Sequence, residues 1–322
     1  MKKEYVIGVD LGGTKILTAL ADLEGNILKR SRVLVGELKD KDTVVTKIKE
    51  TINNVIKETE VDLVEVAGIG LGCPGPLDIE EGLIHHTPNL DLDNINIKEE
   101  LSDLKPPIFL ENDANAAALG EYYFGAGQGV ENMVYITVST GIGGGIIING
   151  DIYHGASDGA GEIGHLTLDP QSDIQCGCGN YGCWEALASG TALSRLGAEA
   201  LEENKDTMIA DLVDEANEVD GAVIAEAAQA GDEVALELID TLAYRLGTGL
   251  ASLINIFNPS RIVFGGGVSN SWPLLKDKIE ETIATRAMKS LWKEAEIIPA
   301  KLSSDVGVMG AIATALAQLE NK

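Results

Sequence analysis

The sequence contains one pattern twice, in which an apolar run is followed by a short glycine-rich turn and a second apolar run. The first copy covers residues 4–22, where EYVIGVD leads into LGGTK and then ILTALAD. The second covers residues 133–150, where MVYITVS leads into TGIGGG and then IIING. Apolar, β-branched runs bounded by glycine predict strands joined by turns. The repetition indicates an internal duplication.

At 322 residues the chain is long for one compact core, so two domains, or two lobes around a cleft, are expected. Apolar residues at helical spacing predict a helix over residues 42–60, which leads into a strand at 64–78. A further strand is expected at 107–112, followed by a helix at 113–125. The later expected elements are helices at 191–217, 220–230, about 233–257 and 273–289, strands at 258–270 and 296–302, and a final helix that Asp305 can cap.

The composition is strongly acidic, with 51 aspartates and glutamates against 24 lysines and arginines and a formal net charge of −27. Such a charge argues against nucleic acid or an anionic membrane surface as the main partner. No uncharged run reaches the roughly 18–20 apolar residues that cross a bilayer, and the amino terminus lacks the features of a signal peptide. A cytoplasmic protein is expected, and clustered cysteines suit a reducing compartment.

Three of the four cysteines and one histidine lie within residues 162–185. Three thiolates and an imidazole in so short a segment can surround one ion, and this ligand set favours tetrahedral zinc. Since no ligand position remains for water, the zinc is expected to be structural and to position Glu162 and Glu185. The alternative is a set of buried or redox-active cysteines. The candidate metal ligands are His165, Cys176, Cys178 and Cys183.

Glycine turns follow apolar strands at residues 12–15, 140–145 and 265–267. Glycine lets backbone N–H groups approach an anion closely, so three such turns suit a phosphate chain. The P-loop pattern is missing, and the second turn leads into a strand, which argues against a Rossmann or P-loop site. Asp10 is a candidate magnesium ligand, with a turn aspartate as the alternative. Lys15 is either a phosphate contact or a solvated lysine.

Asp113 follows Glu111 and Asn112 where an expected strand gives way to a helix. A helix N-terminus stabilises an ionised carboxylate, so Asp113 is a candidate general base, with a helix cap as the alternative reading. In phosphoryl transfer a weak base suffices, because positioning and charge stabilisation carry most of the rate. Amides and carboxylates elsewhere suit a polyhydroxylated ligand such as a sugar. These groups are Asn89, Asn112, Glu162, His165 and Glu185, and His165 can bind zinc through one ring nitrogen and a sugar through the other.

Together these segments make the chain resemble the ROK family (repressors, open reading frames, kinases) of the actin-like sugar kinase superfamily, and most of all its bacterial ATP-dependent glucokinases. The resemblance spans the chain. The matching motifs are DLGGTK at 10–15, LGCPGP at 71–76, END at 111–113, STGIGGG at 139–145, GEIGH at 161–165, CGCGNYGCWE at 176–185 and FGGGV at 264–268.

The resemblance implies a two-lobed α/β fold of RNase H type, an actin-like ATPase fold with a deep cleft between the lobes. Residues 1–115 plus 303–322 are expected to form the small lobe, and residues 116–302 the large lobe with the zinc segment. It also implies a homodimer or homotetramer. Repressors of the family carry a helix-turn-helix domain, and the nine residues ahead of Asp10 leave no room for one, so DNA binding is not expected.

The implied reaction is magnesium- and ATP-dependent phosphorylation of the 6-hydroxyl of glucose, with Asp113 as the base. The alternatives are a kinase for fructose, mannose, allose or N-acetylmannosamine, and a non-catalytic sugar sensor. The implied sugar ligands are Asn89, Asn112, Asp113, Glu162, His165 and Glu185. The implied nucleotide contacts are Asp10, Gly12, Gly13, Thr14, Lys15, Thr140, Gly141, Gly266 and Gly267. The implied zinc ligands are those named above.

Overall fold

The computed structural model describes residues 3–36, 40–87, 90–203 and 206–320. The chain divides into two compact units. The first comprises Met1–Glu131, Gly145–Gly161 and Lys301–Lys322, and the second comprises Asn132–Gly144 and Glu162–Ala300. This division places residues 116–131, 145–161 and 301–302 in the first unit, whereas they were expected in the large lobe.

The first unit is built on a five-stranded sheet with the order β3-β2-β1-β4-β8. The first three strands are antiparallel neighbours, whereas β1, β4 and β8 run parallel. The expected strand at 64–78 is shorter in the structure, because it ends where Pro74 begins a turn, and β5 joins a separate three-stranded sheet with β6 and β7. The strands are β1 (Tyr5–Leu11), β2 (Lys15–Asp22), β3 (Ile27–Leu34), β4 (Val66–Cys73), β5 (Leu77–Asp78), β6 (Leu83–His86), β7 (Asp93–Asn96) and β8 (Ile108–Asn112).

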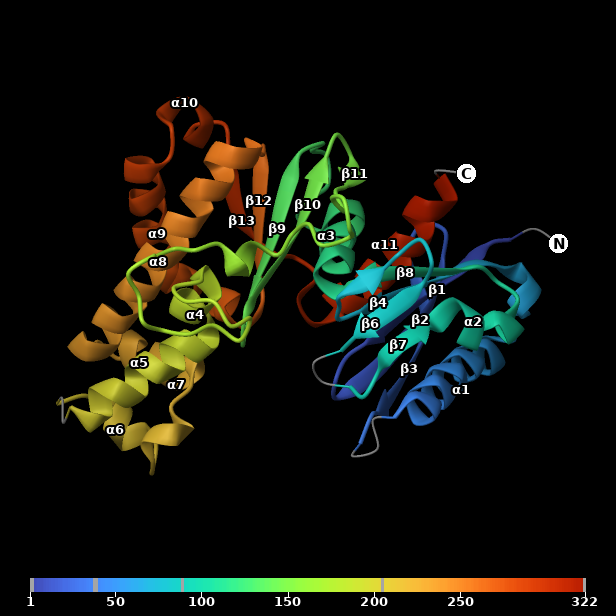
Figure 1. The fold of residues 1–322 in the computed structure, drawn as a ribbon, viewed down its shortest axis with the longest axis horizontal. Helices are drawn as coiled ribbons and strands as arrows, with labels where there is room; N and C mark the ends of the chain where they lie inside the picture. The colour runs from blue at the N-terminus through green and yellow to red at the C-terminus, as the bar shows by residue number, and fades with distance from the viewer. Residues whose placement is uncertain (1–2, 37–39, 88–89, 204–205, 321–322) are drawn as a thin grey trace. The chain divides into compact units, whose positions relative to one another are not determined.

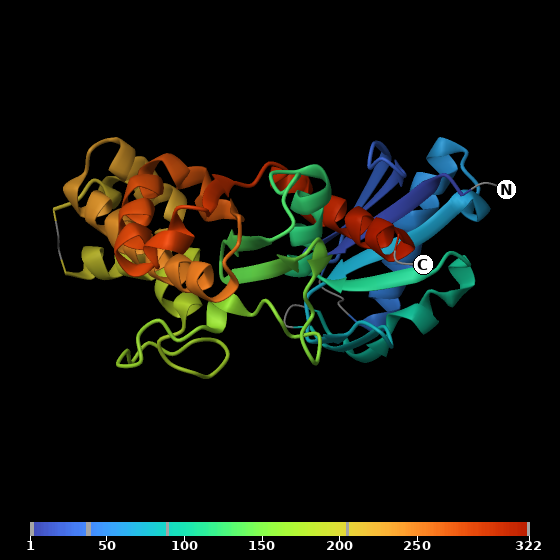
Figure 2. The same ribbon diagram turned by 90° about the horizontal axis from the view of Figure 1, so that it is seen from above.

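Helices cover both faces of this sheet (Figure 1). Side chains alternate along β1, so that Ile7 and Val9 join the core under α1 (Lys41–Thr59), whereas Val6 joins the core under α11 (Val306–Glu320). A methyl group added at Gly70 would lie 1.8 Å from the carbonyl oxygen of Ala311. Glycine in the strand therefore lets α11 lie directly on the sheet, as both ribbon views show (Figures 1 and 2).

A buried carboxylate fastens the start of the carboxyl-terminal segment to α3 (Asp113–Phe124) of the first unit. Glu121, which is fully buried, accepts hydrogen bonds from the backbone N–H groups of Lys301 (2.9 Å), Leu302 (2.8 Å) and Ala126 (2.7 Å). Buried backbone N–H groups need a hydrogen-bond partner, and the Glu121 carboxylate supplies one to these three. Glu121 thus fixes where the chain re-enters the first unit.

Replacing Glu121 with alanine is expected to lower the melting temperature by roughly 5 °C or more. A buried donor left unsatisfied costs about 1–3 kcal/mol, and each kcal/mol corresponds to about 2–4 °C for a unit of this size. Thermal unfolding followed by circular dichroism measures the effect. Glu50→Ala, at an exposed position of α1, is the control and should melt like the wild type. An equal melting temperature for both variants would show that the Glu121 carboxylate does not fasten the segment.

A second five-stranded sheet has the order β11-β10-β9-β12-β13, and the division between the units passes through β10 at Gly144. If the five strands of each sheet are numbered by their order in the chain, both sheets have the spatial order 3-2-1-4-5. The two sheets therefore repeat one arrangement, as the internal duplication predicts. The strands are β9 (Met133–Val138), β10 (Ile142–Ile148), β11 (Asp151–Ile152), β12 (Arg261–Gly265) and β13 (Glu296–Pro299).

The rest of the second unit is mainly helical and packs around α8, the longest helix it contains among the described residues. Trp184 is fully buried there, and a methyl group at Gly249 of α8 would lie 2.2 Å from its ring. The helix expected at 191–217 is shorter and interrupted. The helices are α4 (Trp184–Ala188), α5 (Gly190–Glu202), α6 (Ile209–Leu212), α7 (Gly221–Gln229), α8 (Glu233–Phe257), α9 (Trp272–Arg286) and α10 (Lys289–Trp292). Within the described ranges, no helix combines the length and apolar character that crossing a membrane requires.

Candidate active site and metal centre

The END motif lies at the junction of β8 and α3 in the first unit. Asn112 is the helix cap: its side-chain oxygen accepts hydrogen bonds from the backbone N–H groups of Ala114 (2.9 Å) and Asn115 (3.2 Å). The cap is therefore Asn112, and the alternative reading of Asp113 as the cap is wrong. Asp113 is the exposed first residue of the helix, where the helix dipole favours an ionised carboxylate.

The parallel strands of this sheet end together. Asp10 is in register with Gly72 of β4, and Gly72 is in register with Glu111 of β8, one residue before Asn112. Ligands of open α/β sheets bind at the carboxyl ends of parallel strands. Burial raises the pKa of Asp10, Lys15 opposes this, and the nearby negative charge of Asp113 raises it further. The candidate magnesium ligand and the candidate base thus lie close enough to interact electrostatically.

The first glycine turn is the tight connection between β1 and β2. The backbone N–H of Gly12 donates to the carbonyl oxygen of Lys15 at 3.0 Å, so Gly13 and Thr14 form the tip of the turn. The turn follows Asp10 directly. Gly12, Gly13, Thr14 and Lys15 therefore all belong to the edge of the first unit that carries Asp10 and Asp113.

The second glycine turn is shorter than expected. Ser139 N–H donates to the carbonyl oxygen of Gly141 at 2.9 Å, and β10 already begins at Ile142. The expectation that residues 143–145 belong to the turn is wrong, because these glycines lie inside a strand. A methyl group at Gly144 would lie 2.4 Å from the side chain of Ile163, so close packing accounts for glycine there.

The third glycine turn approaches the second within the second unit. Gly266 has a φ of +86°, and a methyl group there would lie 2.3 Å from the carbonyl oxygen of Val138. Thr140 and Gly267 line one cavity of about 790 Å³, a volume typical of small-molecule sites. Other residues along its wall are Ser139, Gly190, Thr191, Leu193, Ala222, Ala225, Leu242 and Val268.

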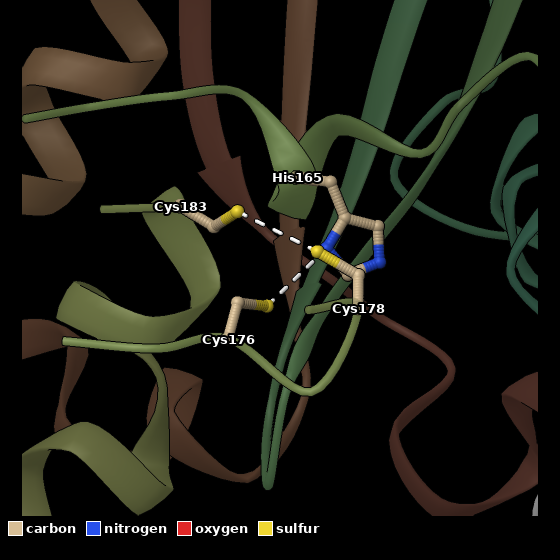
Figure 3. A group of neighbouring side chains, drawn as sticks. All are labelled: His165, Cys176, Cys178 and Cys183. Atoms are coloured by element: carbon tan, nitrogen blue, oxygen red, sulfur yellow. Dashed lines mark hydrogen bonds between the residues drawn. The ribbon is translucent and has the colours of Figure 1, made fainter. Parts of the chain in front are cut away.

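The cysteine-rich segment forms a compact cluster in the second unit. The ligand atoms of His165, Cys176, Cys178 and Cys183 all lie within 4.8 Å of one another, and Figure 3 shows the four side chains gathered together. Cys178 Sγ lies 3.7 Å from Cys183 Sγ, and Cys176 Sγ lies 3.5 Å from His165 Nδ1. Tetrahedral zinc, with bonds of about 2.3 Å to sulfur and about 2.0–2.1 Å to nitrogen, requires separations of about 3.8 and 3.5 Å. The donor set therefore fits a four-coordinate metal ion.

The three thiols differ in acidity. Burial raises the pKa of the Cys176 thiol to about 12 and raises that of Cys183, whereas the backbone N–H of Asn180 lowers that of exposed Cys178. A coordinating thiol loses its proton outright, since the cation stabilises the thiolate. Metal binding by this cluster therefore releases protons and weakens in acid.

Glu162 and Glu185 lie beside the same cluster, each next to one of its members. The two nitrogens of His165 face different partners, because Nδ1 points to Cys176 and Nε2 lies 3.6 Å from Glu162 Oε2. Glu185 lies 3.6 Å from Cys176 Sγ through one oxygen and accepts the backbone N–H of Ile142 at 2.9 Å through the other. A metal ion held here would thus fix the orientation of the imidazole and of Glu185.

The predicted sugar ligands divide between the units: Asn112 and Asp113 belong to the first, and Glu162, His165 and Glu185 to the second. Asn89 lies outside the described residues. Sequence reasoning missed His154, whose Nε2 lies 2.8 Å from Oε2 of the buried Glu111. A histidine within an exposed loop carries no motif of its own. The available signal was Glu111, because an acid at the end of a buried strand needs a polar partner.

Two five-stranded sheets with the same strand order, each with a glycine turn after its first strand, define a protein of the actin-like ATPase class. Residues 6–318 match the ROK family, and the chain belongs to that family. The sequence is 36% identical over 311 residues to a glucokinase of Halalkalibacterium halodurans, covering 96% of this chain and 94% of the relative.

Solved structures show the same fold. A ROK family glucokinase from Streptomyces griseus, in complex with glucose and AMPPNP, matches with a TM-score of 0.79 and 35% identity, covering 96% of this chain and 98% of that one. A ROK family transcriptional regulator, a homologue of the E. coli MLC protein, matches with a TM-score of 0.87 and 28% identity, covering 97% of this chain and 78% of that one. The fold thus occurs in both kinases and regulators.

Proposed function

We propose that the protein is a sugar kinase that transfers the γ-phosphoryl group of ATP to the 6-hydroxyl of glucose. The observation that carries the proposal is the edge of the first unit, where Asp10 lies in the last residues of β1, the Gly12–Lys15 turn follows β1, and Asp113 follows β8. This edge offers a metal ligand, a phosphate turn and a base together. The similarity to glucokinases, one of them solved with glucose and AMPPNP, supports glucose and ATP as the substrates.

In the proposed reaction the oxygen of the 6-hydroxyl bonds to the γ-phosphorus while the bond from that phosphorus to the bridging oxygen of ATP breaks. ADP leaves, and the proton of the hydroxyl passes to the Asp113 carboxylate. In a loose transition state the proton leaves late, so a carboxylate is a strong enough base. The Asn112 cap fixes the start of α3, and the Asp113 carboxylate accepts the backbone N–H of Ala114 at 2.9 Å.

The proposed sugar ligands are carboxylates, amides and one histidine. Carboxylate and amide oxygens accept hydrogen bonds from sugar hydroxyls, and a histidine N–H donates one. His165 would bind the sugar through Nε2, since its Nδ1 faces the cysteines. The proposed sugar ligands are Asn112, Asp113, Glu162, His165 and Glu185, with Asn89 a further proposed ligand outside the described residues.

The proposed nucleotide contacts are Asp10 and residues of the glycine turns. The cavity lined by Thr140 and Gly267 has the size of a small-molecule site, and its walls combine apolar side chains such as Leu242 with polar ones such as Asn270, which suits an adenine nucleoside. Magnesium held through Asp10 would neutralise charge on the phosphates when bound. The proposed contacts are Asp10, Gly12, Gly13, Thr14, Lys15, Thr140, Gly141, Gly266 and Gly267.

We assign zinc to the cluster of His165, Cys176, Cys178 and Cys183. Soft thiolates with one imidazole at tetrahedral spacing select zinc among common cellular metals. Four protein ligands leave no position for water, so the ion would supply rigidity and no catalytic step. It would hold the imidazole and Glu185 in the orientation that the sugar needs.

The proposal is tested by incubating the purified protein with a panel of hexoses and phosphoryl donors and detecting the products by mass spectrometry. Glucose 6-phosphate formed from ATP is the expected result. Faster transfer to fructose, mannose, allose or N-acetylmannosamine would show that this sugar, and not glucose, is the preferred substrate. No transfer to any hexose, together with thermal stabilisation by a sugar, would favour the sensor function, an alternative to which the match with a ROK regulator gives weight.

A further inference from the structure

Glu111 is a buried carboxylate with three hydrogen-bond donors around it. Its side chain is 2% exposed, Oε1 accepts from the backbone N–H of Asn112 (3.0 Å) and from Asn115 Nδ2 (3.1 Å), and Oε2 lies 2.8 Å from His154 Nε2. Among the described residues, Asn115 Oδ1 has no hydrogen-bond partner, so Glu111 alone orients that amide. Glu111 thus joins the last residues of β8 to the first turn of α3, on either side of Asp113.

His154 reaches Glu111 from a segment distant in sequence. It follows β11, and the chain continues from it to Gly161, where it leaves the first unit and enters Glu162, a proposed sugar ligand. Asp158 holds the same segment, because its Oδ2 accepts the backbone N–H of Ile79 at 2.9 Å. One polar contact therefore fastens residues 153–161 to the end of β8, beside Asp113, and a second fastens them to Ile79, the residue that follows β5.

A buried carboxylate is costly unless it is paired and hydrogen-bonded. His154 is 24% exposed at its side chain, and the hydrogen bond with Glu111 raises its pKa against the opposing effect of burial, with Asp158 adding to the rise. The other titratable groups facing His154 line the two cavities that it borders. They are Tyr122, Tyr123, Asp151 and Glu320 in one, and Glu80, Lys98 and Lys105 in the other.

We propose that His154 is a positioning residue for phosphoryl transfer, which acts through Glu111 to hold the strand–helix junction that carries Asp113. This inference rests on the proposed function, because it takes Asp113 as the base. His154 touches neither substrate in this role. It supplies the donor that keeps Glu111 fixed, and Glu111 in turn fixes the peptide N–H of Asn112 and the amide of Asn115.

The kinetic test compares His154→Ala, His154→Gln and Glu111→Gln with the wild type. A base displaced by about 1 Å can cost about 10²-fold in rate, so we expect kcat to fall about 10- to 100-fold in His154→Ala while KM for ATP stays within about twofold. The amide of His154→Gln can still donate to Glu111 and should restore part of kcat. His86→Gln is the control, since exposed His86 pairs with Asp93 away from this junction and should leave kcat unchanged.

The pH profile separates positioning from simple destabilisation. The charged pair is complete below the ordinary histidine pKa of about 6.5 and is lost as pH rises through the raised pKa of His154. Wild-type kcat should therefore decline on the alkaline side, and His154→Gln should lack this decline. A folded His154→Ala protein with wild-type kcat, or an identical alkaline limb in His154→Gln, would overturn the positioning role.

Nuclear magnetic resonance titration of the His154 ring gives a readout independent of activity. The wild-type pKa should lie above about 6.5 and should fall in Glu111→Gln, because the neutral amide no longer stabilises the imidazolium. An unchanged pKa in Glu111→Gln would overturn the pair itself. If the titration confirms the pair but the wild type transfers phosphate to no hexose, the proposed function fails, and the positioning role falls with it.

Discussion

Asp113→Asn is expected to reduce kcat about 10²- to 10⁴-fold, the usual contribution of a positioned general base. The amide has nearly the same shape as the carboxylate but cannot take the proton of the attacking hydroxyl. Asp113 is exposed, so the substitution should leave the fold intact and lower the melting temperature no more than the control substitution described below does. Because the amide oxygen can still accept a hydrogen bond from the sugar and the other proposed contacts remain, KM values should change much less than kcat. An assay that couples ADP release to NADH oxidation measures both constants.

The matched control is Asp42→Asn, which removes an acid from the first turn of α1 just as Asp113→Asn removes one from the first turn of α3. Both substitutions weaken a favourable interaction with a helix N-terminus. Only the variant at 113 should lose turnover. If Asp113→Asn keeps more than about a tenth of the wild-type kcat, a general-base contribution of this size is excluded.

Cys178→Ala is expected to release the metal ion, to lower the melting temperature and to raise KM for glucose about tenfold or more, which corresponds to about 1.4 kcal/mol. Cys178 supplies one of the four ligand atoms, and its loss opens the coordination shell. His165 and Glu185 then lose the cation that orients them. KM for ATP should change less, since the proposed nucleotide turns do not belong to the cluster.

Metal content by plasma mass spectrometry, thermal unfolding and sugar KM together check this prediction. Cys73→Ala is the control, because Cys73 is the remaining cysteine, is buried at the end of β4 and is not a member of the cluster. It should keep its metal. Treatment of the wild type with a chelator should reproduce the effects of Cys178→Ala. Stable, metal-free protein with unchanged affinity for glucose would show that the ion does not shape the sugar site.

The sequence predicted most elements of the fold because their local signals agree with their tertiary surroundings. The helix of residues 42–60 is found as α1, whose apolar stripe faces the sheet and whose Asp40 side chain accepts from Thr43 N–H. The small sheet of β5, β6 and β7 was not predicted. Its strands have two to four residues, too few to show a period, and pairing between them forms it.

Glycine was the main source of error in the candidate site. Glycine is typical of turns, so the sequence predicts a turn at residues 143–145, yet this run lies in β10, where neighbouring side chains leave no room for a methyl group at Gly144 or Gly145. The structure places His165 beside the three cysteines, and the backbone bridges between Thr167 and Cys183 and between Gln175 and Tyr181 fold this short segment back on itself. The contact of His154 with Glu111 joins residues 43 positions apart, and no local pattern encodes such a distance.

The packing of α11 on β1 and β4 has a consequence for the order in which the protein folds on the ribosome. All of the second unit, ending at Ala300, is synthesised before α11, although the first unit contains the amino terminus. Until residues 306–320 emerge, Val6, Leu17 and Ala67 lack the helix that buries them. The nascent chain must therefore keep an apolar sheet face uncovered through most of translation, the kind of surface that chaperones bind.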